Sequence, residues 1–321
     1  MIPTAHDPDA LRFGIHAGQQ QAGFPEYLAL WKLAEEVGLD WASVFDHFLP
    51  IESDPTGSCF EGLTLLSAMA AHTERLRCGV IVLGVTYRHP AVLANMAATI
   101  DHVSGGRLEL GLGAAWYRQE HDQYGIEFPR LGERLDRLDE ACHVLRGLWT
   151  ETEASYAGRH YRLEAARCEP KPLQQRLPLW IGGSGEKRTL RIVAEHADGW
   201  NTFQGPLDEY RHKTEVLARH CADVGRDPGE IRRQLVVRAI LRDTEAEAQE
   251  ELRARAAALG VEPAVFGAGM VVGTAEQCAE ILAPYRDLGA RDFLVLARPP
   301  ADPATLTLLA QGVAPALRAG T

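Results

Sequence analysis

Short apolar runs alternate with longer amphipathic stretches along most of the chain. Apolar runs bounded by glycine or polar residues are typical of buried β-strands, and apolar residues at helical spacing indicate helices that cover those strands. We expect strands at residues 12–18, 41–48, 76–84, 107–113, 177–183, 198–203, 234–241 and 293–297. Helices are expected at 25–38, 61–73, 90–104, 133–149, 186–197, 206–224, 244–258, 274–289 and 303–318.

This alternation predicts an α/β protein with a parallel sheet, because each helix must carry the chain back before the next strand begins. About eight such units in 321 residues favour a closed (β/α)₈ TIM-like barrel with insertions. An open doubly wound sheet is the structural alternative. We expect one barrel domain over residues 1–321, with an insertion at about 151–176 where a small hairpin interrupts the rhythm.

The composition argues against two kinds of partner. The net charge is −11, whereas a nucleic-acid groove requires a concentrated basic surface. No apolar run reaches the roughly 18–20 residues needed to cross a bilayer, and no secretory signal is visible at the N-terminus. We therefore expect a cytoplasmic protein that acts on a small molecule, with no nucleic-acid or membrane partner.

Cysteine and histidine spacing gives no metal-binding pattern. The six cysteines are scattered without a C-x-x-C pair, and the twelve histidines show no H-E-x-x-H or comparable spacing. We accordingly predict no metal in the site, and cysteines that stay reduced in a cytoplasmic environment.

An acid–histidine pair ends one of the apolar runs, in the stretch "WASVFDHFLP" at residues 41–50. The imidazole of His47 can exchange a proton near neutral pH. On spacing alone, a structural histidine is as good an interpretation as a catalytic one, and adjacent strand residues such as Asp46 and His47 point in opposite directions. Active sites of (β/α)₈ barrels lie at the carboxyl ends of the strands, and that position favours catalysis.

A glycine-rich turn follows another expected strand, in the stretch "IGGSGEKRTL". Free amides at the start of a helix bind phosphate, and Lys187 and Arg188 add positive charge; a plain turn is the alternative. Small residues at strand ends also let a flat ring lie close to the backbone. Such residues are Gly84, Gly113, Ala114, Gly182, Gly183, Ser184 and Gly185.

Three stretches together resemble a known family. They are "WASVFDHF", "LRCGVIVLGVTYRHPAVLANMAATIDHVSGGRLELGLGAAWYRQEHDQYGI" and "LPLWIGGSGEKRTLRIVAEHADGWN". They are similar to the bacterial luciferase-like superfamily and most resemble its branch of coenzyme F420 (deazaflavin)-dependent oxidoreductases. The resemblance covers roughly residues 11–300. It implies a TIM-like barrel, commonly a homodimer, with a flavin or deazaflavin at the barrel mouth.

The resemblance also assigns roles to residues. It implies that Asp46 and His47 match the acid–histidine pair whose histidine transfers a proton, and that a non-proline cis peptide falls at about Ile81-Val82. The expected cofactor contacts are Asp46, Ile81, Val82, Gly84, Gly113, Ala114, Gly182, Gly183, Ser184 and Gly185, the last four forming the phosphate loop. On the substrate side we expect Trp116, Tyr117, His121 and Trp200.

Two departures from the family pattern bear on the substrate. Trp116 stands where the sugar-phosphate dehydrogenases of the branch carry a catalytic glutamate, and Gly84 stands where they have a ring-contacting hydroxyl residue. The leading hypothesis is a hydride-transferring F420-dependent oxidoreductase with His47 as proton donor or acceptor. The alternatives are an FMN-dependent monooxygenase that uses reduced flavin and oxygen, and a cofactor-binding protein without turnover.

Overall fold

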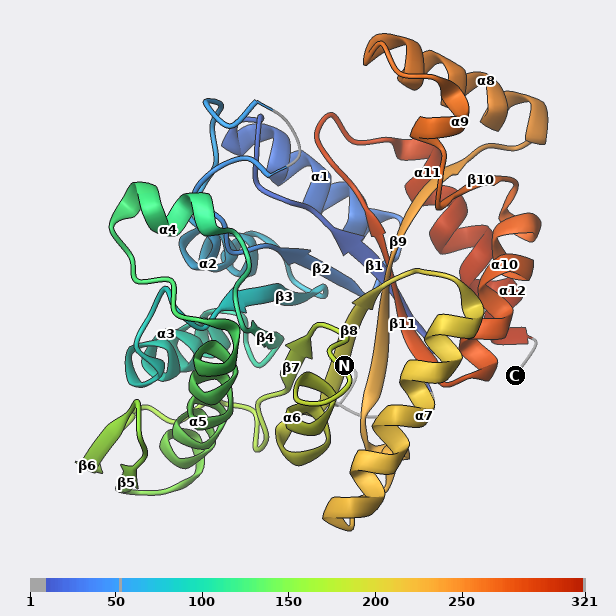
Figure 1. Cartoon of the computed structure of the whole chain (residues 1–321). Helices are drawn as coiled ribbons and strands as arrows, with labels where there is room; N and C mark the ends of the chain where they lie inside the picture. Colours follow the sequence, from blue (N-terminus) through green and yellow to red (C-terminus); the bar gives the residue numbers. More distant parts are fainter. Residues whose placement is uncertain (1–9, 52–53, 320–321) are drawn as a thin grey trace.

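The computed structural model describes residues 10–51 and 54–319 (Figure 1). Eight parallel strands pair in a closed ring, so the predicted TIM-like barrel is confirmed and the open sheet is wrong. In order around the barrel they are β1 (Arg12–His16), β2 (Trp41–Val44), β3 (Arg77–Gly84), β4 (Leu108–Gly113), β7 (Leu179–Gly182), β8 (Gly199–Phe203), β9 (Arg232–Leu241) and β11 (Ala290–Leu296).

Helices surround this ring and carry the chain from one strand to the next (Figure 1). They are α1 (Phe24–Glu36), α2 (Gly62–His72), α3 (Pro90–Val103), α4 (Arg118–Tyr124), α5 (Leu131–Thr150), α6 (Thr189–His196), α7 (Leu207–Val224), α8 (Glu245–Ala258), α9 (Pro263–Phe266), α10 (Ala275–Asp287), α11 (Pro303–Leu308) and α12 (Ala314–Ala319). A 3₁₀ turn (Pro228–Glu230) and a π-helical turn (Leu309–Val313) complete the set. Among the described residues, no helix has the length and apolar character needed to span a membrane.

Most elements lie where the hydrophobic pattern predicts them, and the hairpin of β5 (Ala154–Ala157) and β6 (Arg162–Ala166) stands apart from the barrel, within the expected insertion. Three differences are informative. Strand β10 (Met270–Gly273), which we did not predict, pairs with the carboxyl end of β9. Helix α4 was also missed, because it has only seven residues and an exposed polar face. Helix α6 begins at Thr189, three residues later than expected.

Large side chains fill the interior of the barrel, and two glycines leave the space that these side chains occupy. The rings of Trp41 and Trp180 meet with centroids 5.3 Å apart. A Cβ on Gly79 would lie 2.6 Å from the Trp41 ring, and one on Gly199 would lie 2.2 Å from the Trp180 ring. The strands can therefore close around the two indoles only because these positions carry no side chain.

The amino-terminal end of the barrel, which we call the floor, holds a buried network of charges. Glu109 accepts hydrogen bonds from Arg12 and Arg77, and Asp292 accepts hydrogen bonds from Arg12 and Arg232. Both carboxylates are at most 1% exposed. Burial by itself would raise the pKa of Glu109, but the two guanidinium groups lower it well below its usual range.

Candidate functional site

A cavity of about 1090 Å³ opens at the carboxyl ends of the barrel strands, where active sites of this fold lie. Most of the residues singled out from the sequence line it. These are Asp46, His47, Ile81, Val82, Gly84, Gly113, Ala114, Trp116, Gly182, Gly183, Ser184, Gly185 and Trp200. His16, at the end of β1, lines it as well.

His47 lies in the loop after β2, because that strand ends at Val44 and not at the predicted residue 48. Its Nδ1 is 2.9 Å from Oε2 of Glu120, a residue of α4 that is 0% exposed. Oε1 of the same carboxylate accepts hydrogen bonds from the backbone amides of Phe48 and Leu49, at 2.6 and 2.8 Å. Tyr87 donates its hydroxyl to Oε2. Glu120 thus fixes both the ring of His47 and the loop that carries it.

The contacts of Glu120 determine which nitrogen of His47 carries the proton. Burial raises the pKa of Glu120, but hydrogen bonds from His47 and Tyr87 outweigh it and the pKa lies below its usual value. A carboxylate only accepts hydrogen bonds, so His47 donates from Nδ1. Nε2 is then the nitrogen left to exchange a proton with a molecule in the cavity.

Asp46, the neighbour of His47, faces a different partner. Both of its oxygens accept hydrogen bonds from Arg88 at 2.8 Å, and one also accepts the amide of Gly84 at 3.0 Å. Arg88 continues to Glu61, the N-cap of α2. Burial raises the pKa of Asp46, and the Arg88 pair opposes that shift. Asp46 therefore ties the end of β3 to the loop after β2 and forms no hydrogen bond with the imidazole of His47.

A bulge in β3, the strand next to β2, forms the wall beside this loop. The peptide bond between Ile81 and Val82 is cis, at the position that the family resemblance implies, and the pairing with β4 shifts register here. Cβ atoms placed on Gly113 or Gly182 would lie 2.8 Å from the methyl groups of Val82. Because Gly113 and Gly182 have no side chains, the methyl groups of Val82 pack against their backbone. A flat ring can also approach the backbone closely at these two positions.

The glycine-rich loop forms the third side of the cavity and is also its cationic side. Gly183 has φ +112°, a conformation that L side chains rarely adopt. The cationic lining residues are Lys187, Arg188 and Lys213. Arg188 is bonded to Asp136 and Lys213 to Glu186, whereas Lys187 is exposed and makes no ion pair with the described residues.

The four residues expected on the substrate side fall into two groups. Trp116 and Trp200 line the cavity, but Tyr117 and His121 do not. Trp116 is 62% exposed, and its ring meets that of His47 at 5.5 Å, edge to face. Trp200 is buried and donates its indole N–H to the carbonyl of Gly183 at 2.8 Å.

Tyr117 and His121 support the cavity wall from behind. The ring of Tyr117 stacks on Trp116, with centroids 5.1 Å apart. His121 is 0% exposed and bonds Oγ1 of Thr86 at 2.7 Å, with its ring stacked on Tyr87. The structure therefore places His121 one layer away from any molecule in the cavity.

Sequence reasoning missed the groups that hold His47 and Asp46. Glu120 and Arg88 are distant in sequence from the residues they bond, so no spacing connects them. A weak signal exists for Glu120, because "WYRQEHDQYG" ends in Gly125 with a positive φ, which is typical of a helix end. A helix there would have placed Glu120 on the buried face.

The sequence of this chain matches a known protein family. A family model described as "Luciferase-like monooxygenase" matches residues 10–292. The chain therefore belongs to the luciferase-like monooxygenase family, as the sequence resemblance predicts.

Relatives within the family point to the deazaflavin branch. The chain is 31% identical to an F420-dependent glucose-6-phosphate dehydrogenase of Nocardia farcinica over 337 aligned residues, which cover 96% of this chain and 98% of that protein. A protein of the same name from Microbacterium testaceum is 37% identical, but this match covers only 61% of the chain and 57% of the relative. The predicted resemblance to the F420-dependent branch is thus confirmed.

Solved structures share the fold at low sequence identity. An F420-dependent secondary alcohol dehydrogenase in complex with an F420–acetone adduct superposes with a TM-score of 0.82 at 20% identity, covering 96% of this chain and 99% of that one. The coenzyme F420-dependent tetrahydromethanopterin reductase of Methanopyrus kandleri gives a TM-score of 0.76 at 18% identity, covering 95% of this chain and 99% of that one. At these identities the likeness shows the fold.

Proposed function

We propose that this chain is an F420-dependent oxidoreductase that moves a hydride between the deazaflavin and a small organic substrate, with His47 as the proton donor or acceptor. The observation that carries the proposal is the His47–Glu120 pair on the wall of the cavity. The relatives named F420-dependent glucose-6-phosphate dehydrogenase support the choice of cofactor.

The residues present fit a deazaflavin. The backbone around Gly113 and Gly182, beside the Ile81–Val82 bulge, offers a flat apolar shelf for a ring system. The loop 182–185 and the exposed Lys187 would hold the anionic tail of the cofactor. When bound, the deazaflavin supplies the site that accepts or releases a hydride.

The chain's own contribution is to move a proton and to exclude water. Nε2 of His47 takes a proton from a substrate hydroxyl during oxidation, or gives one to a carbonyl oxygen during reduction. Glu120 stabilises the protonated ring and keeps its orientation, as a buried carboxylate does for a catalytic histidine. Phe45 and Trp116 meet the ring edge to face at 5.0 and 5.5 Å, and they shield it from solvent.

The surroundings of His47 favour a substrate with an apolar body, such as a ketone or a secondary alcohol. Phe45 and Trp116 contact the ring of His47 and line the cavity, whereas the cationic lining residues all lie at or next to the glycine-rich loop. Arg88, the cation that pairs with the neighbouring Asp46, is already bonded to both Asp46 and Glu61. A sugar phosphate would need a free cation near His47.

Parallel titrations with F420 and FMN test the cofactor, followed by turnover assays with F420 and a panel of ketones, alcohols and glucose 6-phosphate. We expect F420 to bind at least about tenfold more tightly than FMN, a difference of about 1.4 kcal/mol, and turnover to be highest with the apolar carbonyl or alcohol. Tighter FMN binding with oxygen consumption would replace the proposal by a monooxygenase. F420 binding without turnover of any substrate in the panel would contradict the role of His47.

A further inference from the structure

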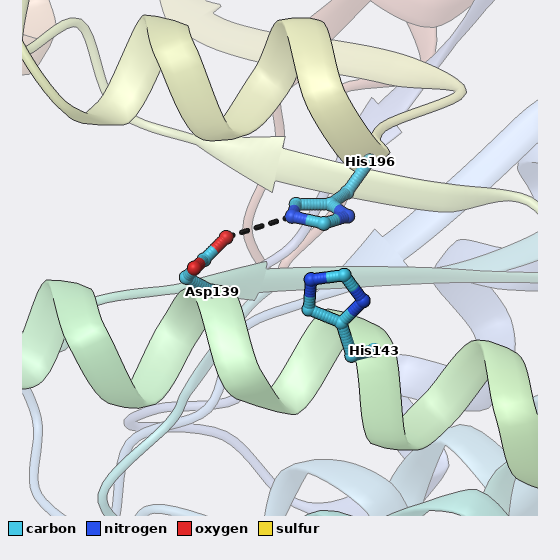
Figure 2. A group of neighbouring side chains, drawn as sticks. All are labelled: Asp139, His143 and His196. Carbon is cyan, nitrogen blue, oxygen red and sulfur yellow. Dashed lines mark hydrogen bonds and ion pairs between the residues drawn. The ribbon is translucent and has the colours of Figure 1, made fainter. Parts of the chain in front are cut away.

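Three potential metal ligands gather on the outside of the barrel, between α5 and α6 (Figure 2). Asp139 and His143 are four residues apart on α5 and so share one face of that helix. His196 is the last residue of α6, the helix beside α5. One ligand atom from each side chain lies within 4.8 Å of the other two.

Two of the three residues are bonded to each other, and the third points at them. Oδ1 of Asp139 is 2.7 Å from Nε2 of His196, and these side chains are 38% and 10% exposed. The exposed ring of His143 meets that of His196 edge to face, with centroids 4.5 Å apart. Tyr156 of β5 stacks on His143 at 5.8 Å. Neither nitrogen of His143 bonds any of the described residues, so its ring is positioned beside the pair and is still free to coordinate.

We propose that Asp139, His143 and His196 bind a divalent transition cation of the zinc class. Two imidazoles and one carboxylate are donors that Zn²⁺ prefers, and a solvent molecule would complete four-coordination on the exposed side of His143. Ligand atoms about 2.0–2.1 Å from a tetrahedral Zn²⁺ lie roughly 3.3 Å apart. Binding therefore requires the 2.7 Å Asp139–His196 contact to open slightly and the exposed His143 side chain to swing inward.

The charge around the three residues supports a cation. Oε2 of Glu195 lies 4.0 Å from Nε2 of His196, which adds negative potential. The guanidinium groups nearby are partly neutralised, because Arg146, which donates to the carbonyl of His196, pairs with Asp198, while Arg188 bonds Asp136 and Arg191 bonds Glu195. Sequence analysis predicted no metal because His196 comes from a different helix than the other two ligands, so no short spacing links the three.

The cation would act as a clamp between two helices and not as part of the cavity chemistry. None of the three ligands lines the cavity. Helix α6 directly follows the glycine-rich loop, so fixing it to α5 steadies the support of that loop. A cation that binds only the folded chain also raises its thermal midpoint by mass action.

Zinc titration of the full-length chain after chelator treatment tests the site. We expect one Zn²⁺ per chain by calorimetry, and a rise in the thermal midpoint that EDTA reverses. His143→Ala removes an exposed side chain that bonds none of the described residues, so it should fold normally and weaken Zn²⁺ binding at least about tenfold. His102→Ala is the matched control, because His102 is an exposed helical histidine that bonds only the carbonyl of Lys171.

A second variant distinguishes the proposed triad from a site on any single histidine. Asp139→Asn keeps the size of the side chain and removes its charge, and we expect it to weaken Zn²⁺ binding to a similar extent. The visible spectrum of bound Co²⁺ should change in both variants and stay unchanged in His102→Ala. No saturable binding to the wild type, or equal Zn²⁺ affinity in the wild type and His143→Ala, would overturn the proposal.

Discussion

The barrel carries a buried carboxylate at each of its two ends, and the two are used differently. At the floor, Glu109 is bonded to Arg12 and Arg77, and the lowered pKa keeps it charged. At the mouth, Glu120 is bonded to His47, Tyr87 and two backbone amides. The floor network joins permanent charges to one another, whereas the mouth network ends on a group that can change its protonation. We therefore propose that the same kind of buried acid serves stability at one end and chemistry at the other.

The comparison extends to the space around the two carboxylates. The Trp41 and Trp180 rings fill the barrel interior above the floor, where they pack against each other. At the mouth, glycines and alanines follow the strands and leave a cavity of about 1090 Å³. The strands thus carry large side chains toward the floor, where the interior is tightly packed, and small ones at their carboxyl ends, where a ligand can bind.

The largest effect is expected from His47→Ala. Removing a positioned general acid or base costs about 100- to 10,000-fold in turnover. Steady-state kinetics with F420 should show this loss, while F420 affinity stays close to that of the wild type. His72→Ala is the control, because His72 is exposed on α2 and remote from the cavity lining. Equal turnover in wild type and His47→Ala would remove His47 from the mechanism.

The next largest effect is on stability and comes from Glu109→Gln. The change leaves Arg12 and Arg77 without their shared carboxylate, and breaking a buried ion pair costs about 3–5 kcal/mol of unfolding free energy. Urea unfolding followed by circular dichroism measures it. Glu153→Gln is the control, because Glu153 pairs with the exposed Arg167 on the hairpin and such pairs contribute less than about 1 kcal/mol. A floor variant as stable as this control would refute the structural role of the network.

His16, on the mouth side of β1, predicts a pH dependence of stability. Burial, and then the charge of His47, lower the pKa of His16 to about 4 from an unfolded value of 6.5. The unfolded chain therefore binds the proton first, so stability is full above pH 6.5 and falls as the pH drops toward 4. We expect the free energy of unfolding of the wild type, relative to that of His16→Gln, to fall by about 2–3 kcal/mol between pH 7.5 and 4.5. Parallel pH–stability curves would contradict a buried neutral His16.

The smallest effect is expected from Glu120→Gln. This is the same chemical change as Glu109→Gln at the floor, so the two variants compare the two buried carboxylates directly. The amide still accepts a hydrogen bond from His47 but carries no charge to stabilise the protonated ring. We expect kcat to fall about tenfold, which corresponds to about 1.4 kcal/mol, with a smaller loss of stability than in Glu109→Gln. Measurements of kcat and of the urea unfolding midpoint for Glu120→Gln and Glu109→Gln test this difference. A Glu120 variant that loses only stability would make this end of the barrel structural as well.

The hydrophobic pattern was sufficient for the barrel because strand and helix periodicities are local properties of the sequence. It also located the cavity, since carboxyl ends of parallel strands must meet at one rim. The family resemblance implied the Ile81–Val82 cis peptide and the glycine-rich loop, and both lie on the cavity wall. Short elements such as α4 and β10 were missed because they have too few residues to show a period.

Tertiary structure alone decided which polar groups meet. The sequence placed Asp46 beside His47, but the fold turns Asp46 toward Arg88 and brings Glu120 to the imidazole. It also brings His196 to Asp139 and His143 on the flank. Such pairings depend on how loops and helices pack after the ring of strands closes, and residues distant in the chain leave no joint signal in a single sequence. The sequence by itself thus determined the barrel and its rim, and packing decided the partners of its charged groups.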